Sequence, residues 1–345
     1  MRIGMMLSYA GGFREAADEV VELEKRGIDL VGVAEAYTFD AVSQLGYLAA
    51  KTSRITLASG ILQIYTRTPS LTAMTAAGID FVSEGRFLMG IGASGPQVIE
   101  GFHGVPYDAP LTRTREVIEI CRAVWRREKL EYEGTKYRIP LPAGEGTGLG
   151  KPLKLINQPV RERIPIYVAS LGAKSVEQTA AIAEGWMPVF FDPARARDVW
   201  GSALDSGKAR RESGLDELRI QISPAFAITE DPQPLFDVVK NQLALYIGGM
   251  GARGKNFYND LVRQYGYDAE ATLIQDLYLD GRKAEAAAAV PDDLVRDVSL
   301  IGPESWVAER IAAFAEAGVT ELAVAPMARS SAERIELMAR LRSLT

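Results

Sequence analysis

The sequence predicts an α/β fold, a (β/α)8 TIM barrel with insertions in its βα loops. Short apolar runs of four to eight residues, rich in Val, Ile, Leu and Met, alternate regularly with amphipathic helices. The apolar runs number eight, which is the strand count of such a barrel. The chain is 345 residues long, a size that single barrels of this class reach.

Each predicted strand is bounded by Gly, Pro, Ser or Asp, and the helices lie between the strands. The expected strands are Arg2–Ser8, Leu30–Ala36, Ile55–Leu62, Phe87–Gly92, Ile164–Ala169, Trp186–Phe191, Ile220–Ala227 and Glu321–Pro326. The expected helices include Phe13–Arg26, Asp40–Thr52, Leu71–Val82, Pro110–Arg127, Ser175–Ala183 and Pro303–Ala317. Glycines that suit helix C-caps follow three helices, namely Gly27, Gly185 and Gly318.

The segment from Ile55 to Gly92 reads as two buried parallel strands joined by one helix. In such folds ligands bind at the loops that follow the carboxyl ends of the strands. Gly60, Gly90 and Gly92 remove side chains there, so a flat group could approach the backbone. The alternative is that these glycines only relieve crowding inside the barrel.

A doubly wound open sheet is the alternative fold. It usually has a glycine-rich turn after its first strand, and Ser8-Tyr-Ala-Gly-Gly12 does not match that pattern. We expect one domain over residues 1–345, with insertions at about 132–163 and 239–290. Long insertions in βα loops commonly form lids or oligomer contacts.

Composition excludes several classes of protein. The chain is 47% hydrophobic and 24% charged, with a formal net charge of −6, which argues against nucleic acid or an anionic membrane as partner. No apolar run is long enough for a membrane span, so we expect a cytoplasmic protein. The single cysteine, Cys121, excludes an internal disulfide and is expected to be a buried, inert thiol.

Few residues are suited to acid–base or nucleophilic chemistry. His103 is the only histidine, and the sequence lacks H-E-x-x-H, CxxC, P-loop and G-x-S-x-G patterns. We therefore expect no metal site and no Ser-His-Asp triad. An enzyme scaffold this poor in reactive side chains suggests an organic cofactor that carries the reaction.

One turn is suited to an anionic group. The fifth strand ends near Ser170, and the small-residue turn up to Ser175 leads into a helix whose first amides lack partners. Lys174 adds a full positive charge. The alternative is that a serine merely caps the helix. Arg253 and Lys255, in a glycine-rich insertion, could meet a second anionic group or lie in a solvated loop.

Several segments together resemble the bacterial luciferase-like superfamily, in its branch of coenzyme F420 (deazaflavin)-dependent oxidoreductases. The segments are Leu57-Ala-Ser-Gly-Ile-Leu62, Thr66-Arg-Thr-Pro69, Ser83-Glu-Gly-Arg-Phe-Leu-Met-Gly-Ile-Gly92, Pro165-Ile-Tyr-Val-Ala-Ser170, Phe102-His-Gly-Val-Pro106, Arg113-Thr-Arg-Glu116 and Tyr132-Glu-Gly-Thr-Lys-Tyr137. The similarity runs from Arg2 to about Phe191 and returns from Ile301 to Arg342.

The resemblance implies a usually dimeric barrel that binds the flat ring of coenzyme F420 at the carboxyl ends of the strands. It implies a non-prolyl cis peptide at Gly60-Ile61. The implied contact positions are Glu35 and Ala36 after strand two, Ala93 and Ser94 after strand four, and a phosphate turn at Ser170, Leu171 and Gly172. We also expect cofactor contacts from Ser59, Gly60, Ile61 and Gln63 in strand three, and from Ala173 and Lys174 beside the phosphate turn.

The sequence departs from the sugar-phosphate dehydrogenases of this branch. They keep an Asp-His pair after strand two and a glutamate after strand four, where this chain has Glu35-Ala36 and Gly95. The remaining acid near the ring is Glu35, with a catalytic and a structural role as equal alternatives. His103 is the second candidate catalytic residue, and its alternative is a surface histidine.

We therefore expect a coenzyme F420-dependent oxidoreductase that moves a hydride between the deazaflavin C5 and a small organic substrate. Without the usual base, reduction of a C=C or C=N bond is favoured over alcohol oxidation. The alternatives are an FMN-dependent monooxygenase on the same barrel and a non-catalytic cofactor-binding protein. A homodimer is expected.

Overall fold

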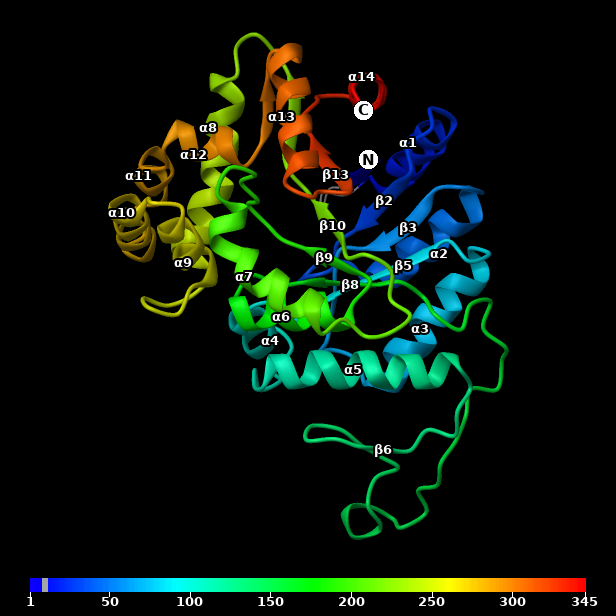
Figure 1. Cartoon of the computed structure of the whole chain (residues 1–345). Helices are drawn as coiled ribbons and strands as arrows, with labels where there is room; N and C mark the ends of the chain where they lie inside the picture. The colour runs from blue at the N-terminus through cyan, green and yellow to red at the C-terminus, as the bar shows by residue number, and fades with distance from the viewer. Residues whose placement is uncertain (8–11) are drawn as a thin grey trace.

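A closed parallel barrel forms the centre of the molecule, as Figure 1 shows for the computed structural model, which describes residues 1–7 and 12–345. Within those residues eight strands follow one another around it, and the last pairs with the first. The strands are β1 Arg2–Met6, β2 Leu30–Val33, β3 Thr56–Ser59, β5 Phe87–Gly92, β8 Ile166–Ala169, β9 Gly185–Met187, β10 Arg219–Ile222 and β13 Glu321–Pro326. The predicted TIM barrel is confirmed.

Helices surround the barrel and cover its strands. They are α1 Phe13–Lys25, α2 Ala41–Lys51, α3 Pro69–Val82, α5 Pro110–Trp125, α6 Ala173–Ile182, α7 Ala196–Ala209, α13 Glu304–Glu316 and α14 Ser331–Ser343. Local chemistry sets several starts: the side chains of Asp40, Thr68 and Ser330 accept first-turn amides of α2, α3 and α14. Cys121 on α5 is buried as expected, and burial raises the pKa of its thiol.

Two of the three glycines predicted to end helices do so, and the third does not. Gly27 and Gly318 follow α1 and α13 with φ of +80° and +91°, a conformation that glycine adopts readily. Gly185 instead begins β9, where a Cβ would lie 2.5 Å from the ring of Tyr167. The prediction that Gly185 is a helix cap was therefore wrong, because close strand packing requires the glycine.

The third and seventh predicted strands are each interrupted. The run Ile55–Leu62 divides into β3 and a two-residue strand, β4 Leu62–Gln63, which pairs with β5. The peptide between Gly60 and Ile61 is cis, as predicted. The run Ile220–Ala227 divides into β10 and β11 Ala225–Ile228, because Pro224 between them has no N–H for the ladder.

Other strand ends differ by a few residues from the hydrophobic runs. The sixth strand stops at Met187, before Pro188, and does not reach Phe191. The second strand stops at Val33. The predicted end of the first strand, Ser8, lies outside the described residues. A short strand that the sequence did not predict, β12 Leu300–Gly302, pairs with β11.

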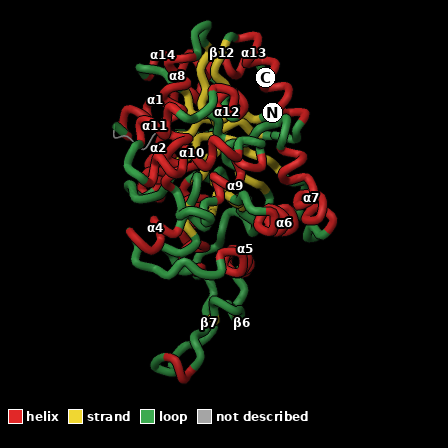
Figure 2. Tube along the Cα trace, turned by 90° about the vertical axis from the view of Figure 1, so that its left-hand side faces the viewer, coloured by secondary structure: helices red, strands yellow, loops and turns green. Residues whose placement is uncertain are grey.

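The two expected insertions are distinct structures. The first carries β6 Tyr132–Glu133, β7 Arg138–Ile139 and η1 Ala143–Glu145, and it projects away from the barrel in both views (Figures 1 and 2). The second is helical and stands beside the barrel, at the left of Figure 1. Its elements are α8 Gln233–Ala244, the π-helix η2 Leu245–Gly249, α9 Phe257–Gln264, α10 Asp268–Leu279, α11 Lys283–Ala288 and α12 Asp292–Asp297.

Two methionines fill the barrel interior next to glycine backbones. A Cβ on Gly60 would lie 2.6 Å from Cε of Met6, and one on Gly90 would lie 3.2 Å from Sδ of Met187. The Gly90 Cβ would also overlap the carbonyl oxygen of Ser59. The contacts at Gly60 and Gly90 are therefore those expected if these glycines relieve crowding inside the barrel.

Two kinds of feature are absent from the described part of the chain. No helix in residues 1–7 and 12–345 has the length and apolar character needed to cross a membrane. The same residues contain no group of three or more His, Cys, Asp or Glu side chains placed to hold a metal ion.

We predict that Gly90→Ala lowers the free energy of unfolding by about 1–3 kcal/mol, because the added methyl group has no space between β3 and β5. The matched control is Gly46→Ala in α2, where a Cβ would meet nothing within 4 Å. That control should gain about 0.5–1 kcal/mol from helix propensity. Denaturant unfolding of both variants checks this, and equal stabilities would contradict the packing argument.

Candidate functional site

The carboxyl ends of β2, β3, β5 and β8 meet at one end of the barrel and place most predicted site residues there. In the strand register Val33 pairs with Ser59, Gln63 with Gly92, and Gly92 with Ala169. The loops that follow these strands are therefore neighbours, which is the position where barrels of this class bind ligands.

The segment around β3 and β4 forms one wall of this end. Ser59 is fully buried, and its hydroxyl donates to the carbonyl of Gly90 at 2.9 Å, so the hydroxyl already has a partner. Ile61 packs against Gly92. The amide of Gln63 donates to the carbonyl of Ala36 at 3.4 Å, whereas its buried Oε1 has no partner among the described residues. Gln63 thus keeps an acceptor for an N–H donor.

The loop after β5 has an unusual backbone conformation. Ser94 has φ of +59°, which non-glycine residues adopt rarely and often at functional sites. Its carbonyl accepts from the hydroxyl of Tyr107 at 3.3 Å, and burial raises the pKa of Tyr107 so that this donor stays protonated. Ala93 packs against the core. The loop therefore offers backbone rather than charged side chains.

The turn after β8 is held by indole groups. Trp186 and Trp200 donate from Nε1 to the carbonyls of Ser170 and Leu171, each at 2.8 Å. These hydrogen bonds hold the turn in place and occupy the carbonyl groups of both residues, directly before α6 begins.

The first turn of α6 is open to an anion. Gly172 precedes it with φ of −68°, and no side chain caps the helix. Gly172, Ala173 and Lys174 are exposed, and Ser175 donates its hydroxyl back to the carbonyl of Gly172 at 2.7 Å. The serine side chain therefore leaves the amides of Ala173 and Lys174 available, together with the positive end of the helix dipole. The Ser175 amide itself donates to the carbonyl of Gly172 at 2.9 Å.

The carboxylate of Glu35 is fully engaged by neighbouring groups. Both of its oxygens accept from Arg67, at 2.5 and 2.9 Å, and Oε2 also accepts the amide of Ala41 at 2.9 Å, at the start of α2. The Glu35 and Arg67 side chains are only 9% and 15% exposed. These contacts match the structural alternative, and a catalytic role for Glu35 stays a prediction.

His103 follows a short helix, α4 Pro96–Gly101, in the loop after β5. Its ring is half-buried, and Nε2 is buried without a partner among the described residues. The ring packs edge-on against exposed Phe102, which in turn lies 6.3 Å from the ring of Tyr37 in the loop after β2. His103 therefore has a free ring nitrogen beside the site, and its catalytic role remains a prediction.

An aromatic cluster at the same end was missed by the sequence reasoning. Phe190, after β9, meets Tyr246 and Tyr258 of the helical insertion at ring distances of 5.3 and 6.0 Å. Phe190 has φ of +53°, and the hydroxyl of Tyr265 donates to its carbonyl at 2.8 Å. Tyr258 and Tyr265 belong to the helical insertion, but no local sequence pattern predicted their contact with Phe190.

The structure does not bring Arg253 and Lys255 into contact with the other predicted residues. The exposed guanidinium of Arg253 bonds to Asp276 at 2.9 Å and lies 3.9 Å from Asp280. Lys255 is exposed in the same turn. Their predicted role in binding a second anionic group stays a prediction.

The arrangement fits a flat heterocycle that carries a phosphate. The β3–β4 wall supplies a free acceptor at Gln63, and the start of α6 supplies free amides. Aromatic rings lie at the same end, suited to an apolar substrate. The carboxylate of Glu35 at this end is engaged by Arg67 and by the amide of Ala41, so the chemistry fits a group that brings its own reactivity.

Known proteins are similar to this chain over most of its length. Residues 1–321 match the model of the luciferase-like monooxygenase family. A protein of Mycobacterium tuberculosis named as a coenzyme F420-dependent oxidoreductase is 40% identical, over 99% of both chains. The 5,10-methylenetetrahydromethanopterin reductase of Archaeoglobus fulgidus is 25% identical, over 91% of this chain and 90% of its own.

A solved structure has the same fold. The coenzyme F420-dependent tetrahydromethanopterin reductase from Methanopyrus kandleri superposes with a TM-score of 0.83, over 100% of this chain and 99% of that chain. Its sequence is 22% identical, so this likeness concerns the fold alone.

We predict that Glu35→Gln lowers the free energy of unfolding by about 1–3 kcal/mol, because Arg67 then remains buried without a charged partner. The matched control is Asp205→Asn, which breaks an exposed pair with Arg197 and should change stability little. Thermal and denaturant unfolding measure both. Unchanged stability of Glu35→Gln with a large loss of turnover would instead identify Glu35 as catalytic.

Proposed function

The chain belongs to the luciferase-like monooxygenase family, and on that basis we propose that it is a coenzyme F420-dependent oxidoreductase acting on a small organic molecule. The observation that carries the proposal is the 40% identity, over 99% of both chains, with the mycobacterial protein named for that cofactor. Identity of this extent spans every strand end that contributes to the candidate site.

Contacts at the candidate site support this proposal. The phosphate would lie at the exposed first turn of α6, beside Gly172 and Lys174. The ring would lie against the Gly60–Gln63 segment, where Oε1 of Gln63 accepts an N–H. The deazaflavin, when bound, supplies hydride transfer at its C5, and the protein orients the substrate.

The preferred reaction is reduction of an electron-poor C=C or C=N bond. Such a reaction needs a hydride at one atom and a proton at the other, and no base has to remove a proton from the substrate. Glu35 is held by Arg67 and Ala41, whereas Nε2 of His103 is free. We therefore assign the proton delivery to His103. Turnover of the reduced cofactor with enones and imines tests this reaction.

We expect the protein to bind coenzyme F420 more tightly than FMN, with an affinity that falls as salt rises. Lys174 and Lys255 are exposed cations that would pair with the anionic tail, and Arg253 is exposed as well, although it bonds to Asp276 at 2.9 Å. Exposed pairs are screened within about 8 Å at physiological ionic strength. Fluorescence titration of both cofactors at low and high salt measures this. Tighter FMN binding would favour a monooxygenase.

The position of the phosphate is tested by Gly172→Asp, for which we expect at least about tenfold weaker cofactor binding from charge repulsion. Gly172 has an ordinary φ of −68° and a Cβ there has only Ser175 Oγ within 4 Å, at 3.7 Å, so the fold should tolerate the change. The control is Gly144→Asp, on the projecting insertion, where a Cβ meets nothing within 4 Å. Equal affinities for both variants would place the phosphate elsewhere.

A homodimer is part of the proposal, and the outer face of α3 is its interface. Leu71, Met74, Phe81 and Val82 are 46–64% exposed on that face. The apolar surface continues onto Val160, whose Cγ1 would lie 3.5 Å from a Cβ on Gly85. An apolar stripe of this kind suits a two-fold contact with the same stripe of a second copy.

We predict a dimer for the wild type and a monomer for Phe81→Glu, because a carboxylate near the carboxyl end of the α3 face cannot be buried against a second copy. Phe81 is 64% exposed, so the fold itself should be unaffected. Light scattering measures the mass. Leu279→Glu, on α10, is the control and should remain a dimer. A dimeric Phe81→Glu would place the interface elsewhere.

A further inference from the structure

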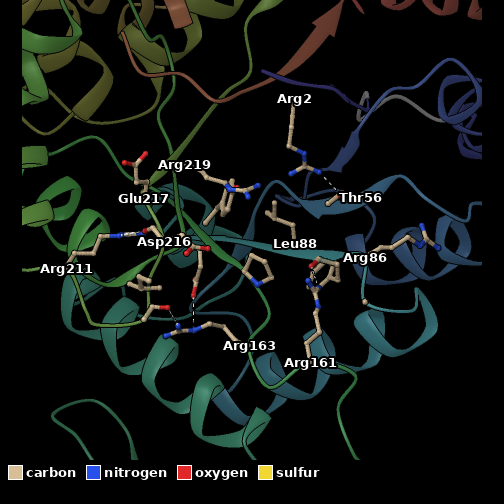
Figure 3. A pocket seen from close by; sticks show the side chains of 17 residues that line it. Arg2, Thr56, Arg86, Leu88, Arg161, Arg163, Arg211, Asp216, Glu217 and Arg219 are labelled. Atoms are coloured by element: carbon tan, nitrogen blue, oxygen red, sulfur yellow. Dashed lines mark hydrogen bonds and ion pairs between the residues drawn. The ribbon is translucent and has the colours of Figure 1, made fainter. Parts of the chain in front are cut away.

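A cavity of about 390 Å³ opens at the end of the barrel opposite the candidate site. Its wall includes residues at or near the amino ends of six strands, among them Arg2, Thr56, Phe87 and Arg219. Six arginines line the cavity, and Figure 3 labels all of them: Arg2, Arg86, Arg161, Arg163, Arg211 and Arg219. The carboxylates of the lining are Glu184, Asp216 and Glu217.

Two carboxylates at this end are each shared between two guanidinium groups. Glu321, fully buried next to the cavity, accepts from both Arg2 at 2.9 Å and Arg219 at 3.4 Å. Glu184 is likewise shared, by Arg122 at 3.0 Å and Arg163 at 3.4 Å. Each of these carboxylates therefore serves two guanidinium groups, although the whole chain carries a net charge of −6.

One lining arginine has a purely structural role. Arg86 points away from the cavity in Figure 3 and donates to five neutral acceptors, including the carbonyls of Ala49 and Ile55. Arg211 also bonds to backbone carbonyls, but its Nη2 is buried without a partner among the described residues. An unpartnered buried donor in a cavity wall indicates that an acceptor is missing there.

Three other arginines point into the cavity. Figure 3 shows the side chains of Arg2, Arg161 and Arg219 directed toward Leu88, which lines the apolar floor. Arg161 is anchored by Asp80 and donates to the carbonyl of Phe87 at 2.5 Å. The side chains of Arg161 and Arg219 are 31% and 51% exposed, so a ligand can reach them. Arg163 also lines the cavity and is 42% exposed, but its guanidinium is directed toward the carbonyl of Gly214, to which it donates at 2.5 Å.

We propose that this cavity binds a small molecule that carries a phosphate or diphosphate group, with Arg161, Arg163 and Arg219 holding its oxyanions. Guanidinium groups match phosphate oxygens in shape and charge. The volume lies in the range of small-molecule sites, and Leu88 and Pro165 give the non-phosphate part an apolar surface. The site is separate from the proposed cofactor site, because the two lie at opposite ends of the barrel.

Isothermal titration calorimetry with inorganic pyrophosphate tests the proposal. We expect wild-type protein to bind with a dissociation constant below about 1 mM, and Arg219→Gln and Arg163→Gln each to weaken binding at least about tenfold. Glutamine keeps the length and polarity of the side chain and removes the charge. The control is Arg197→Gln on α7, which is 73% exposed, paired with Asp205 and outside the cavity, and should bind as the wild type does.

A further variant separates this cavity from the cofactor's phosphate turn. Gly172→Asp should leave pyrophosphate binding at the cavity unchanged. Loss of binding in Gly172→Asp with retention in both arginine variants would overturn the proposal, as would no binding by the wild type or equal weakening in Arg197→Gln. Thermal unfolding without ligand shows whether each variant is folded, and the two arginine variants provide independent tests of the same site.

Discussion

Closure of the barrel depends on one buried carboxylate, Glu321, at the amino end of β13. It accepts hydrogen bonds from Arg2 on β1 and from the hydroxyl of Tyr167 on β8, each at 2.9 Å, and from Arg219 on β10 at 3.4 Å. A buried charge is tolerated only when it is paired and hydrogen-bonded, so these four strands must meet for the carboxylate to be buried at all. The carboxylate thereby links the first and last strands of the barrel, which lie far apart in the sequence.

The packing inside the barrel determines which groups are available for binding at the carboxyl ends of the strands. Met6 and Met187 fill the space that glycine backbones at positions 60 and 90 leave free. On the wall formed by β3, β4 and β5, Gly60 and Gly90 contribute only backbone, and Gln63 contributes an amide whose oxygen has no partner among the described residues. Charged groups nearby are committed to structure, as Glu35 and Arg67 show. A site built in this way positions a reactive molecule rather than supplying reactivity.

Hydrophobic runs predicted the barrel and its eight strands, whereas the site after β3, β5 and β8 stays a prediction. They overestimated strand lengths, because apolar character continues through Pro224 and Pro188 although the hydrogen-bond ladder does not. Contacts between distant segments could not be predicted. Neither the pairing of Glu35 with Arg67 nor the approach of Tyr246 to Phe190 leaves a local pattern, since each depends on how loops of different strands meet. The resemblance to a family indicated the cis peptide, which composition alone would not.

The left-handed backbones of Ser94 and Phe190 restrict how this site can diverge. Side chains branched at Cβ are strongly disfavoured at φ of +59° and +53°, so valine, isoleucine and threonine are poor replacements at both positions. Glycine, asparagine and aspartate fit the backbone, but at position 190 they would remove the ring that meets Tyr246 and Tyr258. Evolution toward other substrates is therefore easier through the helical insertion, whose side chains can change while the two turns keep their shape.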